Sequence, residues 1–194
     1  MQLDVKEAPL AYFVVCDGDL RTDRSVSGIV HRFAGAAIAV QSVRQHSIAI
    51  DAHSSECFTA STAACQAVAF RGMLTELRIS QELPTPIYSD SRSTLLVAQN
   101  AAALRKSIYI LRRILFMREA VNNGEVDFFS CAGGTNPADP LTKYVKKKTY
   151  ALGRIQVASP RSVANLLRRV CRRIQSAVPH LRKSTCRNDF RWVW

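Results

Sequence analysis

Four acidic residues fall where predicted strands end or predicted helices begin. In chain order they are Asp17, Glu56, Asp90 and Asp139. Strand ends and helix starts can meet on one side of a sheet, so distant carboxylates can share one site. Carboxylate oxygens suit Mg²⁺, and two such ions can hold the attacking and leaving oxygens at a phosphorus centre. The pattern therefore predicts a metal-dependent nuclease.

Taken singly, each carboxylate also has a simpler explanation. Asp17 and Asp90 could be turn or capping residues, and Glu56 could be a first-turn residue favoured by the helix dipole. Asp19 and Asp23 lie near Asp17 in the sequence, and we expect them to be solvated turn residues rather than metal ligands. The prediction of a metal site depends on the order of the four carboxylates, not on any one of them.

Hydrophobic periodicity predicts the elements that must position these residues. Strands are expected at about 9–16, 27–33, 36–41, 87–89 and 125–131, and helices at about 54–79, 90–100, 104–122 and 138–147. Three successive strands with short links favour antiparallel pairing. Each of the two later strands follows a helix and can join the sheet in parallel. The expected fold class is α/β, with a mixed five-stranded sheet flanked by helices and a basic C-terminal helical tail.

The helix expected at 104–122 has an apolar stripe and a basic side. The stripe consists of Leu104, Ile108, Leu111 and Leu115, and the basic side consists of Arg105, Lys106, Arg112 and Arg113. The basic side could hold phosphate groups, and a solvated helix face is an equal alternative.

The net charge of +12 is concentrated at one end of the chain. Residues 1–142 hold 13 Lys and Arg against 14 Asp and Glu, whereas residues 143–194 hold 14 against 1. We therefore expect a domain at 1–148 and a basic tail at 149–194, with one amphipathic helix at about 160–177 and poor order in the remainder. The tail could bind nucleic acid, lie on an anionic membrane, or be noise from a degenerate reading frame.

The remaining sequence features concern the compartment. No apolar run approaches the roughly 18–20 residues needed to span a bilayer, so no membrane span is expected. The N-terminus has neither a basic start nor an apolar signal core, which favours an intracellular protein of the cytoplasm or nucleus over a secreted one. The six cysteines form no CxxC pair and are expected to be reduced.

Five short motifs occur in an order that resembles the ribonuclease H domain of copia-type retrotransposon polyproteins. They are Asp17-Gly18-Asp19 with Arg24-Ser25-Val26-Ser27-Gly28, then Ser54-Ser55-Glu56-Cys57-Phe58, then Pro86-Ile87-Tyr88-Ser89-Asp90-Ser91-Arg92-Ser93, then Arg118-Glu119 with Asn123-Gly124-Glu125, and finally Ala138-Asp139-Pro140-Leu141-Thr142-Lys143. The resemblance covers about two thirds of the chain.

This resemblance implies a ribonuclease H fold, two Mg²⁺ or Mn²⁺ ions, and hydrolysis of the RNA strand of RNA–DNA hybrids. Carried over by motif, the catalytic and metal-binding residues would be Asp17, Glu56, Asp90 and Asp139. The partners implied are a hybrid and the reverse transcriptase region of the same polyprotein, and the chain would be a fragment of such a polyprotein or a decayed copy. We expect a monomer.

Selection of RNA would depend on contacts with the 2′-hydroxyl across the wide minor groove of the hybrid. Candidate contacts are Ser91, Arg92 and Asn100, together with the basic residues of the helix expected at 104–122. The sequence departs from the family at Ser54, where a second glutamate is usual, and at Leu20, where an aromatic residue is common. The stretch 107–111 also lacks the histidines usual there.

Two other functions remain as alternatives. One is a catalytically silent nucleic-acid-binding remnant in which the fold survives and the tail supplies affinity. The other is a transposase- or integrase-like strand-transfer enzyme, which has a similar sheet. The usual order of carboxylates in that class ends in a glutamate, whereas Glu56 comes second here. That order disfavours strand transfer.

Overall fold

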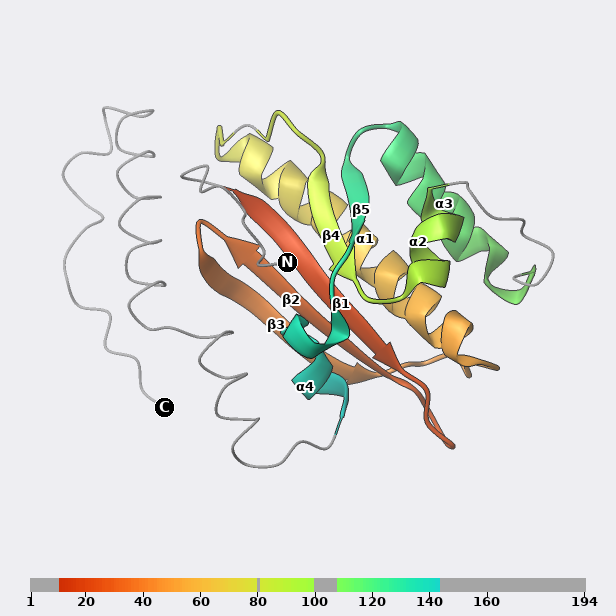
Figure 1. Cartoon of the computed structure of the whole chain (residues 1–194). Helices are drawn as coiled ribbons and strands as arrows, with labels where there is room; N and C mark the ends of the chain where they lie inside the picture. The colour runs from red at the N-terminus through yellow and green to blue at the C-terminus, as the bar shows by residue number, and fades with distance from the viewer. Residues whose placement is uncertain (1–10, 80, 100–107, 144–194) are drawn as a thin grey trace.

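The central feature of the fold is a mixed sheet with the strand order β3-β2-β1-β4-β5 (Figure 1). The computed structural model describes residues 11–79, 81–99 and 108–143. The strands are β1 (Tyr12–Asp19), β2 (Val26–Phe33), β3 (Ala36–Arg44), β4 (Thr85–Ser89) and β5 (Val126–Ser130). The first three pair antiparallel, while β4 pairs parallel with both β1 and β5. The predicted fold class is confirmed for these residues.

Helices cover both faces of the sheet, one face more fully than the other. They are α1 (Ala52–Glu76), α2 (Arg92–Ala98), α3 (Leu111–Asn122) and α4 (Asp139–Thr142), with 3₁₀ turns η2 (Ile108–Ile110) and η3 (Gly133–Thr135). The first three helices lie against one face, and the short α4 lies against the other (Figure 1). No helix among the described residues is long and apolar enough to cross a membrane.

Strand β1 is buried on both faces because it lies between these two layers. Val14 and Cys16 face the larger core under α1, whereas Phe13 and Val15 face the smaller core under α4. This position explains the unbroken apolar run in the sequence, since a strand covered on both sides has no solvent face.

Helix α1 owes its close contact with the sheet to small residues. Ala60, Ala63, Ala64 and Ala67 are fully buried against the strands. The helix begins where the Asp51 side chain accepts a hydrogen bond from the Ser54 N–H at 2.7 Å, which satisfies one of the free donors of the first turn. No proline interrupts the helix before its end at Glu76.

The prediction of a helix at 104–122 is wrong in two respects, its start and its buried face. Helix α3 starts only at Leu111, and Leu115 of the predicted stripe is 49% exposed. Ile114 and Met117 are fully buried instead. This segment carries two apolar stripes side by side, and periodicity alone cannot choose between them. Residues 104–107 lie outside the described residues, as do the tail at 149–194 and its predicted helix.

The contact between α4 and the sheet leads to a stability prediction at Gly28. A Cβ there would lie 2.8 Å from the Ala138 carbonyl oxygen and 2.9 Å from Thr142 Cγ2. We expect Gly28→Ala to lower the free energy of unfolding by about 1–3 kcal/mol, because α4 must move off β2. The matched control is Gly72→Ala, where an added Cβ meets nothing within 4 Å. It should raise stability by roughly 0.5–1 kcal/mol. Urea unfolding of both variants checks the prediction, and equal effects would contradict it.

Candidate metal centre

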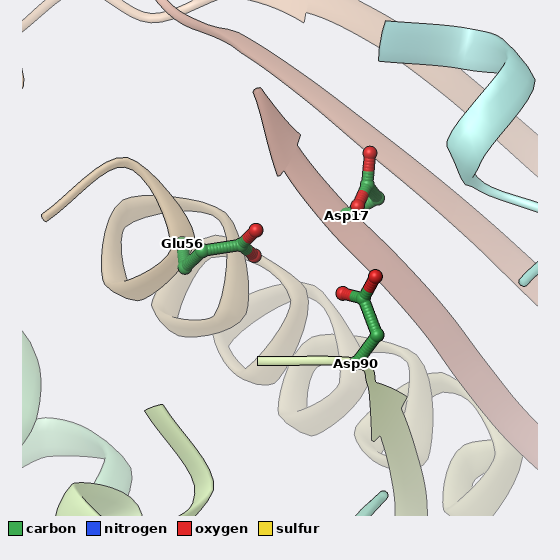
Figure 2. Close-up of side chains that lie close together, drawn as sticks. All are labelled: Asp17, Glu56 and Asp90. Carbon is green, nitrogen blue, oxygen red and sulfur yellow. The ribbon is translucent and has the colours of Figure 1, made fainter. Parts of the chain in front are cut away.

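Three of the four predicted carboxylates meet at one end of the sheet. Asp17, Glu56 and Asp90 each place an oxygen so that the three atoms lie within 4.8 Å of one another (Figure 2). Asp17 comes from β1, Glu56 from α1, and Asp90 from the residue after β4. Residues that are 39 and 34 positions apart in sequence are thus neighbours in space.

Parallel pairing brings the two aspartates together. Val14 of β1 pairs with Ile87 of β4, and each aspartate lies three residues beyond its paired residue. Asp17 lies within β1 rather than after it, because the pairing with β2 continues through Asp17 and Gly28. The sequence prediction ended this strand at residue 16, three residues before its end at Asp19.

Glu56 is held toward β1 by the backbone of Gly18. The Gly18 N–H donates to Glu56 Oε2 at 3.1 Å. A Cβ on Gly18 would lie only 2.8 Å from the Ser55 carbonyl oxygen and 2.8 Å from Thr59 Oγ1. The absence of a side chain therefore allows α1 to approach β1 closely enough for this hydrogen bond.

Thr142 and Asn136, which the sequence analysis did not select, hold the part of β1 that carries Asp17. Thr142 Oγ1 of α4 donates to Asp17 Oδ2. Asn136, 4% exposed, donates from Nδ2 to the Cys16 carbonyl at 3.1 Å and accepts from the Ala138 N–H at 2.9 Å. Asn136 thereby fixes the segment that leads into α4. The sequence hint was that Thr142 belongs to the closing motif around Asp139 and that Asn136 lies two residues before this motif.

The three carboxylates carry an electrostatic penalty in the absence of a cation. Burial, followed by Asp17 and Asp90, raises the pKa of Glu56 from 4.5 to about 8. Burial also raises the pKa of Asp17, although the hydrogen bond from Thr142 opposes this effect. Asp90 Oδ1 is buried and has no hydrogen-bond partner in the part of the chain that the structure describes.

These features fit a divalent cation. Oxygen atoms on opposite sides of one Mg²⁺ are about 4.2 Å apart, twice the usual Mg–O distance, so small side-chain rotations would allow three of these oxygens to share an ion. The donor set is all oxygen, as Mg²⁺ and Mn²⁺ prefer. A cation would also neutralise the repulsion and give the buried Asp90 oxygen a partner.

Asp139 lies next to this cluster but is not part of it. It opens α4, and its Oδ1 accepts a hydrogen bond from Lys143 Nζ one turn later. That hydrogen bond is the largest cause of a raised pKa at Lys143. Asp139 is close enough to contribute to the raised pKa of Asp17. Its assignment as a fourth metal ligand stays a prediction.

The other acidic residues near Asp17 are engaged elsewhere. Asp19 pairs with Arg21 at 3.2 Å, and Asp23 pairs with Arg44 at 3.1 Å on the exposed surface. Neither belongs to the carboxylate cluster found among the described residues.

The predicted nucleic-acid contacts are only partly placed. Ser91 is the N-cap residue of α2 and is hydrogen-bonded to Thr94 at 2.9 Å, and the exposed Arg92 follows it beside Asp90. Arg112 is exposed on α3. Arg113 instead serves the fold. It donates to Ser61 Oγ at 3.0 Å, and its guanidinium lies 4.6 Å from the centre of the Phe58 ring. Asn100, Arg105 and Lys106 lie outside the described residues.

Comparison with known proteins agrees with this architecture. No protein-family model matches the chain. A stretch of 135 residues is 27% identical to the "Retrovirus-related Pol polyprotein from transposon TNT 1-94" of Nicotiana tabacum, covering 70% of this chain and 10% of that polyprotein. The chain thus spans about a tenth of the length of this relative.

Solved ribonuclease H structures show the same fold. LC11-RNase H1 in complex with an RNA/DNA hybrid has a TM-score of 0.55 and 13% identity, over 72% of this chain and 99% of that one. The N-terminal RNase H domain of rv2228c from Mycobacterium tuberculosis has a TM-score of 0.54 and 11% identity, over 77% and 99%. The resemblance seen in the sequence is therefore confirmed: the chain is homologous to a stretch of a retrotransposon Pol polyprotein and has a ribonuclease H-like fold.

Proposed function

We propose that this domain is a metal-dependent endonuclease that hydrolyses the RNA strand of RNA–DNA hybrids, as part of a copia-type retrotransposon polyprotein or derived from one. The observation that carries the proposal is the meeting of Asp17, Glu56 and Asp90 within 4.8 Å at the end of a ribonuclease H-like sheet. A neighbour of the same fold was solved with an RNA/DNA hybrid, which supports this substrate class.

The protein groups have separate roles in this proposal. Asp17, Glu56 and Asp90, with Asp139 beside them, would hold two Mg²⁺ or Mn²⁺ ions. Bound ions would activate the attacking water and stabilise the leaving 3′ oxygen of the RNA strand. The Gly18 N–H orients the Glu56 carboxylate, and the Thr142 hydroxyl orients that of Asp17. The carboxylates of Glu56 and Asp17 are therefore oriented before any ion binds, which lowers the cost of assembling the site.

Substrate contacts would come from the elements next to the carboxylates. Ser91 and Arg92 follow Asp90 directly in the chain, and Arg92 is exposed. We propose that they contact the sugar–phosphate backbone and the 2′-hydroxyl, which distinguishes RNA from DNA. Arg112, together with Asn100, Arg105 and Lys106, would add phosphate contacts. In the polyprotein, the reverse transcriptase region would supply the hybrid.

The test is a cleavage assay with the full chain and a hybrid whose RNA strand carries a 5′ label. We expect the RNA strand to be shortened in Mg²⁺ or Mn²⁺ and to stay intact in excess chelator. A DNA duplex and single-stranded RNA of the same sequence serve as controls, and both should remain uncut. Binding of the hybrid without cleavage in either metal would contradict the proposal and favour the catalytically silent alternative.

A further inference from the structure

Arg21, in the loop after β1, joins the end of this strand to the end of α4. Its Nε donates to Asp19 Oδ2 at 3.2 Å, and its Nη2 donates to the Thr142 carbonyl oxygen. Both members of the ion pair are mostly buried, with 26% of the Arg21 side chain and 28% of the Asp19 side chain exposed. The guanidinium is a rigid, planar fork, so it can hold two acceptors in a fixed relation. Arg21 therefore links two segments that are 121 residues apart.

Thr142 is consequently attached to β1 at two points. Its hydroxyl donates to Asp17 Oδ2, and its carbonyl accepts from Arg21, which Asp19 holds. Asp17 and Asp19 are two residues apart on one strand, so their side chains leave the sheet on the same face. Val15 of the same strand lies in the core under α4, which shows that this face is the one that α4 covers. A residue attached at both its hydroxyl and its carbonyl is held in one orientation.

Helix α4 depends on contacts of this kind because it is a single turn. It spans only Asp139–Thr142, and a helix of that length is not stable by itself in water. Its last carbonyl groups have no partner within the helix and need donors from elsewhere. Ser42 of β3 donates to the Leu141 carbonyl at 2.6 Å, and Arg21 donates to the Thr142 carbonyl. Donors from the sheet and its first loop thus hold the end of α4 in place (Figure 1).

The Thr142 hydroxyl has two acceptors within reach and only one proton to donate. Besides Asp17 Oδ2, the Asp139 carbonyl oxygen lies 3.0 Å away in the same helix. A hydrogen bond to the carbonyl three residues earlier is a common local alternative for threonine. If the end of α4 moved away from β1, the hydroxyl would turn to this carbonyl, and Asp17 would lose its hydrogen bond. The position of α4 therefore decides which acceptor the hydroxyl serves.

We propose that Arg21 is a positioning residue for the metal centre, which holds the end of α4 so that the Thr142 hydroxyl stays on Asp17. The inference rests on the proposed function, because the orientation of the Asp17 carboxylate affects the reaction only if that carboxylate binds an ion. Removal of a group that orients a metal ligand typically weakens metal binding by about 10–100-fold. Arg21 acts one contact further from the ligand, through Thr142, so its removal should have a smaller effect.

Amide hydrogen exchange on the full chain tests the first part of the proposal without metal or substrate. The Leu141 N–H donates to the Ala138 carbonyl at 2.9 Å, so its exchange rate reports opening of the α4 turn. In Arg21→Ala, we expect the Leu141 amide to exchange at least about tenfold faster than in the wild type. The amides of β1 should exchange at their wild-type rates, which would show that the sheet is intact.

Mn²⁺ binding tests the link between Arg21 and the metal centre. The electron paramagnetic resonance signal of free Mn²⁺ gives the dissociation constant without any cleavage. We expect Arg21→Ala to raise this constant by about threefold to tenfold, and Thr142→Val to raise it by at least about tenfold. In a chain that already carries Thr142→Val, adding Arg21→Ala should change the constant by less than about twofold, because both residues act through one contact. Thr142→Ser retains the hydroxyl and should bind Mn²⁺ as the wild type does.

Arg44→Ala is the matched control. Arg44 pairs with Asp23, and these side chains are 70% and 60% exposed, so the variant removes the same charge from a solvated pair. It should leave both measurements at their wild-type values.

Four results would overturn the proposal. Arg44→Ala could have the same effects as Arg21→Ala. The exchange rate of the Leu141 amide, or the affinity for Mn²⁺, could be unchanged in Arg21→Ala. The effect of Arg21→Ala on Mn²⁺ binding could also be as large in Thr142→Val as in the wild type. A wild-type chain that binds no Mn²⁺ would overturn the nuclease proposal itself, and the exchange of the Leu141 amide would then still show whether Arg21 holds α4.

Discussion

Asp17→Asn and Asp90→Asn should each reduce cleavage of the RNA–DNA hybrid by at least about a thousandfold, equivalent to roughly 4 kcal/mol of transition-state stabilisation. An amide is nearly the same size as a carboxylate but carries no charge, so it binds a divalent cation poorly. Both residues lie in the cluster of oxygens within 4.8 Å of one another. Single-turnover cleavage rates with saturating enzyme measure the effect, because they isolate the chemical step from product release.

The fold should survive both substitutions. The side-chain oxygen of an asparagine at position 17 can still accept the hydrogen bond from Thr142. Each substitution removes one of three carboxylates that repel one another. The melting temperature of the metal-free protein should therefore stay the same or rise. Asp23→Asn is the matched control, since Asp23 pairs with Arg44 on the exposed surface and should retain wild-type cleavage. Cleavage that persists in Asp17→Asn and Asp90→Asn would remove the site assignment.

The order of elements could be predicted from sequence because each signal is local. The apolar run before Asp17 and the proline-free, alanine-rich stretch after Asp51 each determine one element without reference to the rest of the chain. The meeting of Asp17 and Asp90 could also be predicted, because parallel neighbours bring their carboxyl ends to one edge of the sheet.

What could not be predicted depends on contacts between distant residues. The hydrogen bond from Thr142 to Asp17 joins residues 125 positions apart, and the one from Asn136 to Cys16 joins residues 120 positions apart. No periodicity in the sequence indicates either one. The buried face of α3 was missed for the same reason, because only packing against α1 selects Ile114 over Leu115.

The second large effect concerns stability and pH. Without divalent metal, the free energy of unfolding should fall by roughly 2–4 kcal/mol more in the wild type than in Glu56→Gln between pH 5 and pH 8. The folded protein raises the pKa of Glu56 from 4.5 to about 8, chiefly by burial and then by Asp17 and Asp90. As the pH rises through this window, the unfolded chain has released the proton that the folded chain still holds. The stability that comes from the raised pKa of Glu56 is therefore fully present below pH 4.5 and is lost as the pH passes about 8.

Mg²⁺ should reverse this loss, because it binds the ionised carboxylates of the folded state. At a hundred times its dissociation constant, a ligand specific for the folded state adds about 2.7 kcal/mol. The rise in melting temperature on adding Mg²⁺ should therefore be larger at pH 8 than at pH 6, where protons compete for Glu56. Glu56→Gln should show a smaller rise that varies less with pH, and Asp23→Asn should behave as the wild type. A Mg²⁺ effect that is equal at both pH values in the wild type would show that Glu56 does not bind the ion.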